Sequence, residues 1–283
     1  MPLHEERDGP IVTLSYEGRT PMNPLAHDEY VALAKRLQEL DEEQDVHVAI
    51  LRGYGEKHFS VGGDLVVIAE LHEAMKRESP VGAFVEQYFF PHPGRHSVPG
   101  SLVDWFRWHD LIYDRPTQTP IVAATRGACL GAAFVTYMLH SSIRIAGESS
   151  LFGFAELRRG MAGGVGLAHP FGQMLDAGVM HLASGELIGA AEARRLGFVN
   201  EVVADERVYE RAREVAEKIA SMPRWVVLAE KLALRRFARQ PVGQAAAAAR
   251  VVPTILALRD ATDADRGLAE TGAKEEVPHA RRP

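Results

Sequence analysis

The chain has 283 residues, of which 46% are hydrophobic and 25% are charged, and its formal net charge is -6. This length and composition predict one large globular domain, or one domain with an appendage. The acidic balance excludes nucleic acid as a main partner, because binding to a phosphate backbone depends on clustered Lys and Arg.

Signals for export or membrane insertion do not appear in the sequence. Residues 1–7 have no apolar segment of the kind that a secretory signal carries. No apolar run reaches the ~18 to 20 residues that are needed to cross a bilayer. The single cysteine, Cys129, cannot form an internal disulfide. We therefore expect a cytoplasmic protein with no membrane partner.

The first predicted elements are a strand, a helix and a strand. Residues 11–16 alternate as a strand and end at a Glu-Gly-Arg turn. Residues 27–40 follow Asn23-Pro24 and have apolar side chains at helical spacing. Residues 46–52 form a second apolar strand. Short polar connectors between these elements favour an α/β fold over a sandwich.

A turn of small residues comes next and runs into a predicted helix. Its sequence is His58-Phe-Ser-Val-Gly-Gly-Asp-Leu65. It does not fit a serine-hydrolase elbow, because His58 stands where the first glycine would be. It does not fit a phosphate-binding loop either, because no Gly-Lys-Ser/Thr follows. Taken alone, a turn of this kind is more often a structural feature than part of a catalytic site.

Residues 66–116 are uneven, with helical patches on both sides of a loop at residues 91–100 that is rich in Pro, Gly and His. Loops of this length inside compact domains are often lids or binding loops. His92 and His96 either act in the chemistry or are ordinary solvated side chains.

The longest apolar stretch, residues 119–139, predicts a buried strand, a tight turn and a buried helix. The strand covers residues 120–124, the turn covers residues 126–131, and the helix starts at Ala132. Free N–H groups and the partial positive charge at a helix start suit a developing negative charge. The alternative is a buried strand-turn-helix without chemistry.

The rest of the chain predicts two more strands and a set of helices. A strand at residues 142–146 precedes a glycine-rich segment, residues 160–166, which lacks the strand and the later ribose acid of a dinucleotide site. Helical stretches dominate after residue 203. We therefore predict a core at 1–203, a C-terminal helical part at 204–266 and a disordered tail at 267–283.

Five motifs in order resemble the crotonase, or enoyl-CoA hydratase/isomerase, family. They are Phe59–Leu65, similar to F-S-A-G-x-D-L; Arg126–Ala133, similar to a second glycine loop; Ser142–Ala146; Phe152–Glu156; and residues 184–200. The resemblance spans Ile11 to about Asp265. It implies an α/β fold made of a spiral of ββα units with a C-terminal helical appendage. It also implies assembly as a homotrimer or a dimer of trimers.

The resemblance further implies an acyl-CoA thioester as the ligand, with coenzyme A as part of the substrate and no other cofactor or metal. In the family two backbone N–H groups hold the thioester oxygen, and the matching positions are Gly63 and Ala132. Removal of a proton beside a thioester places negative charge on that oxygen, and preorganised donors stabilise the charge. Small residues at both turns would let the thioester approach the backbone.

The sequence departs from the family at one catalytic position. Family hydratases use two glutamates, of which the second matches Glu156, while the first falls at Val135 or Thr136. Neither side chain can replace a carboxylate as a base. One acid is enough to move a proton between two carbons, as in the family's double-bond isomerases. An apolar wall would raise the pKa of Glu156; alternatively, Glu156 is an ordinary acid beside Arg158 and Arg159.

The resulting hypothesis is a lyase or isomerase that moves a proton on an enoyl-CoA through a stabilised enolate, by double-bond isomerisation or by hydration. A thioester hydrolase or decarboxylase of the same fold is the second alternative, and a non-catalytic acyl-CoA-binding protein is the third. Candidate acyl or CoA contacts are Val61, Asp64, Leu65, Val135, Thr136, His169 and Lys231.

Overall fold

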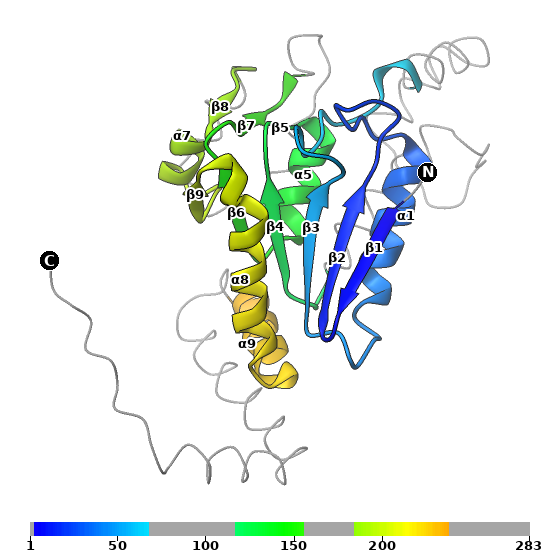
Figure 1. Cartoon of the computed structure of the whole chain (residues 1–283), viewed down its shortest axis with the longest axis vertical. Coiled ribbons are helices and arrows are strands. Elements are labelled where there is room, and N and C mark those ends of the chain that lie inside the picture. Colours follow the sequence, from blue (N-terminus) through cyan, green and yellow to red (C-terminus); the bar gives the residue numbers. More distant parts are fainter. Residues whose placement is uncertain (1–2, 68–116, 156–183, 238–283) are drawn as a thin grey trace, which may run out of the picture. The chain divides into compact units, whose positions relative to one another are not determined.

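The computed structural model describes residues 3–67, 117–155 and 184–237 (Figure 1). Contacts divide the chain into two compact units, residues 1–222 and residues 223–283. The strands are β1 (Leu3–Asp8), β2 (Ile11–Tyr16), β3 (Val48–Gly53), β4 (Ile121–Thr125), β5 (Ala128–Leu130), β6 (Ile143–Gly147), β7 (Leu151–Gly153), β8 (Ile188–Gly189) and β9 (Glu201–Val203). The helices are α1 (His27–Glu39), α5 (Gly131–His140), α7 (Ala190–Arg195), the 3-10 helix η3 (Asp205–Arg207), α8 (Val208–Ala220) and, in the second unit, α9 (Arg224–Phe237). The predicted mixed α/β class is confirmed.

The first unit is built on a six-stranded sheet in the order β1-β2-β3-β4-β6-β9. All neighbours pair in parallel except β1, which pairs with β2 in antiparallel fashion. The carboxyl ends of parallel strands meet at one edge of a sheet. The chain segments that leave β3 and β4, which contain the two predicted turns, therefore start from the same edge.

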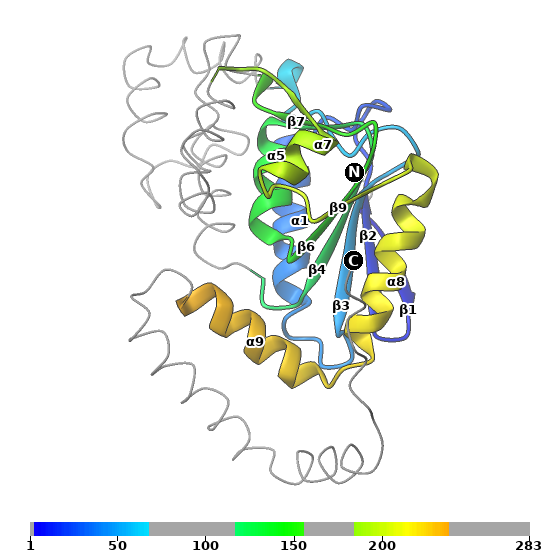
Figure 2. The same ribbon diagram turned by 90° about the vertical axis from the view of Figure 1, so that its left-hand side faces the viewer.

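Helices cover both faces of this sheet. Figure 2 shows α1 and α5 on one face and α8 on the other. In β3, Ala49 and Leu51 belong to the core under α1 and α5, whereas Val48 and Ile50 belong to the core under α8. This alternation follows from the two-residue period of a strand. A sheet that is buried on both faces explains why the strands read as continuous apolar runs.

Helix α8 packs on the sheet through three buried residues that are spaced four apart, Val208, Ala212 and Ala216. This spacing places them on one face of a helix. The sequence assigns residues 204–266 to a C-terminal helical part, but α8 covers the sheet of the first unit, and the compact units divide after Met222. The predicted domain bounds themselves stay a prediction.

Residues 126–131, which were expected to form one tight turn, instead contain a strand. β5 occupies three of these residues and pairs with β7 in a small second sheet, β5-β7-β8. Glycines bound the strand: Gly127 has φ +52° and Gly131 has φ +53°. The two glycines make separate bends, so the expectation of a single turn was wrong.

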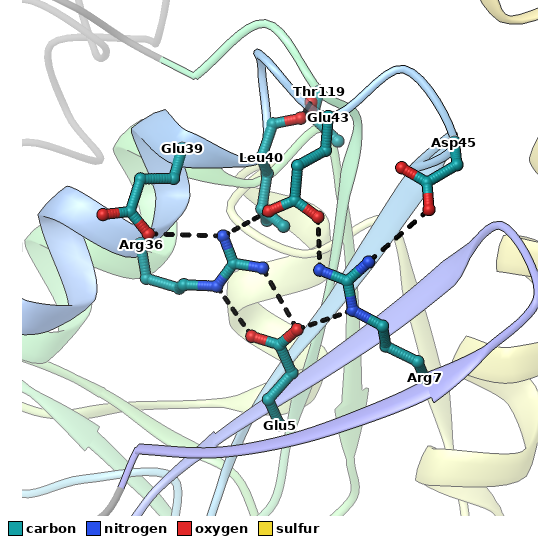
Figure 3. Close-up of polar contacts among 8 residues, drawn as sticks. All are labelled: Glu5, Arg7, Arg36, Glu39, Leu40, Glu43, Asp45 and Thr119. Carbon is teal, nitrogen blue, oxygen red and sulfur yellow. Dashed lines mark hydrogen bonds and ion pairs between the residues drawn. The ribbon is translucent and has the colours of Figure 1, made fainter.

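Charged side chains link α1 to β1 at the amino ends of β3 and β4. Arg36 donates to Glu5 and to Glu43, and Arg7 contacts the same two acids (Figure 3). These hydrogen bonds, above all those from Arg36, lower the pKa of both carboxyls. The Thr119 hydroxyl, just before β4, donates to the Leu40 carbonyl at 3.1 Å. The network thus ties the edge strand β1 to α1 and to the segment between α1 and β3.

Candidate active site

The two glycine-containing segments expected to form the site lie against each other. Ser60 N donates to Ala128 O at 2.8 Å, and Leu130 N donates to Ser60 O at 3.0 Å. A Cβ atom at Gly62, whose φ is +91°, would lie 2.6 Å from the Leu130 carbonyl oxygen and 3.4 Å from the Ala132 nitrogen. Only glycine fits at position 62 without moving the backbone. Segments that are about 70 residues apart in the sequence are therefore in direct contact.

Gly63 and Ala132, the predicted donors, each follow one of the tight bends. Ala132 is the second residue of α5, and an N–H in the first turn of a helix has no intrahelical acceptor. Around Gly63, Leu25 N donates to Gly62 O and Asp64 N donates to Leu25 O, which leaves the Gly63 N–H outside this pairing. Within the described residues, neither N–H donates to another protein group.

The two positions that could match the first family glutamate are both buried in α5. Val135 and Thr136 are each 2% exposed. The Thr136 hydroxyl donates to the Ala132 carbonyl at 3.0 Å, which is a bond within its own helix. The sequence of α5, Gly131–His140, contains no carboxylate. This helix therefore brings no acid to the site, whichever of the two positions is the match.

Asp64, a candidate pocket residue, is engaged by other protein groups. Its side chain is 2% exposed, it accepts hydrogen bonds from both Arg19 Nε and Arg19 Nη2, and it accepts one from Val66 N. The Arg19 hydrogen bond lowers the pKa of the Asp64 carboxyl, although burial acts to raise it. An ionised and paired carboxylate is unsuited to carry a proton near neutral pH. Asp64 therefore serves to link the turn to Arg19 and not to carry a proton.

Three apolar side chains beside the glycine turn at residues 58–65 are exposed: Met22 at 49%, Leu65 at 43% and Val66 at 52%. Val61 is partly buried, and its N–H donates to Met22 O at 3.1 Å. Residues 65–67 are helical, as the sequence predicts for the segment after the turn. Of the predicted pocket residues, Val61 and Leu65 thus lie next to Gly63 in a partly apolar environment.

The second described segment, residues 117–155, ends one residue before Glu156. Phe152 and Phe154, which lead to it, each pack on Phe134 of α5 with ring centroids 5.7 Å apart. Glu156, His169, His92 and His96 fall outside the described residues, so their predicted roles stay predictions. Lys231 is on α9 in the second unit, so its predicted contact with the substrate also stays a prediction.

Two side chains near the first turn were missed at the sequence level. Ser60 appears there only as a failed hydrolase nucleophile, and Asn23 only as the residue before a helix. In the structure both are buried and hydrogen-bonded to the turn. The only sequence signal for these two residues was a polar side chain within an apolar segment, and such a signal does not show which group the side chain bonds.

In the described parts of the chain, no group of three or more His, Cys, Asp or Glu is placed to hold a metal ion.

A sequence model described as enoyl-CoA hydratase/isomerase matches residues 12–276. The chain therefore belongs to the enoyl-CoA hydratase/isomerase family, whose members act on acyl-CoA thioesters. Curated relatives include the carnitinyl-CoA dehydratases of Salmonella typhi, 25% identical over 278 residues and 96% of each chain, and Salmonella typhimurium, 25% identical over 275 residues and 95% of each chain.

Solved structures show the same fold. The structure of a putative enoyl-CoA hydratase/isomerase from Mycobacterium abscessus has a TM-score of 0.72 at 25% identity, and the match covers 99% of both chains. An enoyl-CoA hydratase from Bacillus anthracis has a TM-score of 0.75 at 22% identity and covers 95% of this chain and 96% of its own. The predicted crotonase fold is confirmed.

Among the described residues, no helix has the length and apolar character that a membrane crossing requires.

Proposed function

We propose that the protein is an enzyme that binds an acyl-CoA thioester, holds its carbonyl oxygen with the N–H groups of Gly63 and Ala132, and moves a proton with Glu156. One observation carries the proposal: the two tight bends are in contact, and both N–H groups remain unused by the described protein. Coenzyme A enters as part of the substrate, and the proposed chemistry needs no other cofactor and no metal.

The proposed oxyanion site supplies most of the catalytic effect. Loss of a proton beside the thioester turns its carbonyl oxygen into an enolate oxygen. Donors that already point at that oxygen need no rearrangement during the reaction, and each is worth on the order of 100- to 1000-fold in rate. The partial positive charge at the start of α5 acts in the same direction.

Double-bond isomerisation is the reaction we favour. It needs one acid that takes a proton from one carbon and returns it to another, and Glu156 is the proposed carrier. The absence of any carboxylate from α5 supports this choice, because the helix provides no second acid to activate a water. Phe152 and Phe154 precede Glu156 in an apolar setting, and burial there would raise the pKa of its carboxyl towards neutrality.

Hydration, or the reverse dehydration, is the second candidate. The curated relatives named carnitinyl-CoA dehydratase favour it, since they match nearly the whole chain. Such a reaction would require Glu156 to work with a water held by groups other than a glutamate on α5. We also propose that Val61 and Leu65 contact the acyl-CoA beside the turn, with His169 and Lys231 as further candidate contacts. The chain is proposed to assemble as a homotrimer or a dimer of trimers.

The test is a panel of enoyl-CoAs with 2,3- and 3,4-double bonds, followed by mass and retention time. An unchanged mass with a new retention time marks isomerisation, and a gain of one water marks hydration. Glu156→Gln should abolish turnover while the Kd for the ester changes little. The matched control is Glu148→Gln, because Glu148 is an exposed acid with no proposed role in the reaction.

Full turnover by Glu156→Gln would contradict the proposed proton carrier. Release of free CoA or of carbon dioxide would favour the hydrolase or decarboxylase alternative. Tight binding of the whole panel without any turnover would favour an acyl-CoA-binding protein.

A further inference from the structure

The orientation of the peptide unit between Gly62 and Gly63 is fixed by hydrogen bonds on its carbonyl side. Gly62 O accepts a hydrogen bond from Leu25 N at 2.8 Å. The peptide is trans, so its C=O and N–H point in opposite directions. Because the C=O faces Leu25, the Gly63 N–H is directed away from Leu25. The groups that fix the plane of the Gly62–Gly63 peptide unit therefore also set the direction of the Gly63 N–H.

A buried hydroxyl holds the other side of Gly62. The Gly62 N–H donates to Ser60 Oγ at 3.0 Å, and the Ser60 hydroxyl donates to the Asn23 carbonyl at 2.6 Å. A serine hydroxyl has one proton and two lone pairs. Since the proton goes to Asn23, a lone pair of Ser60 Oγ faces the Gly62 N–H. Ser60 is 0% exposed, so bulk water does not compete for either bond.

Asn23 fixes the carbonyl that Ser60 uses. It is 2% exposed, and its φ of +49° is the one positive value of a non-glycine residue in the described chain. Asparagine tolerates this conformation better than most residues. Its Nδ2 donates to Tyr54 O at 2.9 Å and to His58 O at 3.0 Å, and its Oδ1 accepts from Gly18 N at 3.2 Å. Asn23 thus joins its own connection between β2 and α1 to the segment that leads from β3 into the turn.

We infer that Ser60 and Asn23 are positioning residues that aim the Gly63 N–H at the thioester oxygen. Neither side chain needs to touch the substrate: Asn23 orients the Ser60 hydroxyl, Ser60 fixes Gly62, and the Gly62–Gly63 peptide plane then directs the donor. The inference rests on the proposed function, in which the Gly63 N–H binds the carbonyl oxygen of an acyl-CoA.

The test measures polarisation of a bound carbonyl as well as turnover. Isotope-edited infrared spectra of [1-13C]butyryl-CoA on the wild-type protein should show the thioester C=O band at lower frequency than in solution. Ser60→Ala should lose most of that shift. Its kcat on the enoyl-CoA that the panel identifies should fall by about 100-fold, with KM changed less than about 3-fold, because a small misplacement of a donor has an effect of that order.

Two further variants separate positioning from general stability. Ser141→Ala removes a buried hydroxyl that donates to Tyr137 O at the far end of α5, and it should keep the full shift. Asn23→Gly accepts the φ of +49° and keeps the backbone carbonyl, but loses the amide bonds. It should lose part of the shift and about 10-fold in kcat.

A folded Ser60→Ala protein with the wild-type shift and kcat would overturn the positioning role and leave the oxyanion site standing. If Ser60→Ala does not fold, the same result for Asn23→Gly overturns it. A wild-type protein that binds butyryl-CoA with no shift would overturn the proposed oxyanion site, and the inference with it.

Discussion

The two segments that carry the proposed donors are held in different ways. In the first, residues 59–64, side-chain hydrogen bonds hold the backbone: the Ser60 hydroxyl bonds Gly62 N and the Asn23 carbonyl, and Asp64 pairs with Arg19. In the second, the donor lies in the first turn of α5, and the Thr136 hydroxyl reaches the Ala132 carbonyl rather than its N–H. One donor thus depends on side chains far apart in sequence, and the other on the geometry of a helix start.

Because the two donors are held differently, different substitutions should disturb each of them. Among substitutions only proline removes a backbone N–H, so other substitutions can disturb the first donor only through the residues that aim it. The second is vulnerable through the helix start and through the close contact between the two segments at Gly62. Four substitutions test these statements, in order of decreasing effect.

Gly62→Ala should have the largest effect, because it strains the first turn and separates the two segments. The new Cβ would meet the Leu130 carbonyl oxygen, and the positive φ adds about 1 to 2 kcal/mol of strain. We expect about 3 kcal/mol of lost stability in urea unfolding and a loss of about 1000-fold in kcat.

The matched control for this variant is Gly55→Ala. Gly55 has a similar φ, +78°, but a Cβ there would have no heavy atom within 4 Å. It should lose only the strain, about 1 to 2 kcal/mol, and keep its activity. Equal activity losses in both variants would show that backbone strain, and not contact between the segments, is what matters.

Ala132→Pro should remove the second donor while α5 remains. Proline is tolerated in the first turn of a helix, where the N–H has no helical acceptor. We expect kcat to fall by about 100- to 1000-fold, with the far-ultraviolet circular dichroism unchanged. Ala132→Gly keeps the N–H and should retain most of the activity. Similar kcat values for the two variants would exclude Ala132 as a donor.

Thr136→Val should have little effect on catalysis. Its hydroxyl bonds only its own helix among the described residues, and it leaves the Ala132 N–H untouched. We expect kcat within about 2-fold of wild type and a stability change below about 1.5 kcal/mol. A loss comparable to that of Ser60→Ala would mean that Thr136 acts on the substrate, and the contrast between the two segments would then be wrong.

Arg36→Gln should leave catalysis unchanged. Arg36 is in the last turn of α1, which bonds through Leu40 to Thr119 at the amino end of β4, whereas the two segments follow the carboxyl ends of β3 and β4. Arg36 lowers the pKa of Glu5 and Glu43 in the folded protein below the ordinary 4.5. Their contribution to stability is therefore present above about pH 4.5 and is lost as the pH falls through the lowered values. The variant should lose less than about 3 °C in Tm at pH 7 and show a weaker loss of stability in acid.

Arg195→Gln is the control for this effect, because Arg195 pairs with Glu192 on an exposed surface of α7. Its stability should follow the wild-type dependence on acid closely. If Arg36→Gln also kept that dependence, the network of Figure 3 would not be the source of it.

Sequence patterns predicted the parts of the fold whose burial is regular. β2, β3 and β4 have apolar runs because both faces of the sheet are covered, and α1 and α8 have apolar faces at helical spacing. β1 was missed because it is a polar edge strand, with only Leu3 as an aliphatic residue. β5, β7 and β8 have two or three residues each, which is too short for any period to appear.

The site was predictable only in part, for a physical reason. The glycine bends and the donor positions follow from local sequence and from the family resemblance. The Ser60 and Asn23 contacts join residues 37 positions apart, and no local pattern specifies such a pairing. The role of Glu156 rests on a position outside the described residues and stays a prediction.

The central claim is that one thioester oxygen is bound by the N–H groups of Gly63 and Ala132. A crystal structure with bound butyryl-CoA tests it most directly. The account predicts that the thioester oxygen lies about 2.7 to 3.1 Å from both nitrogens. An oxygen more than about 4 Å from either nitrogen, in a complex with ordered ligand, would contradict it.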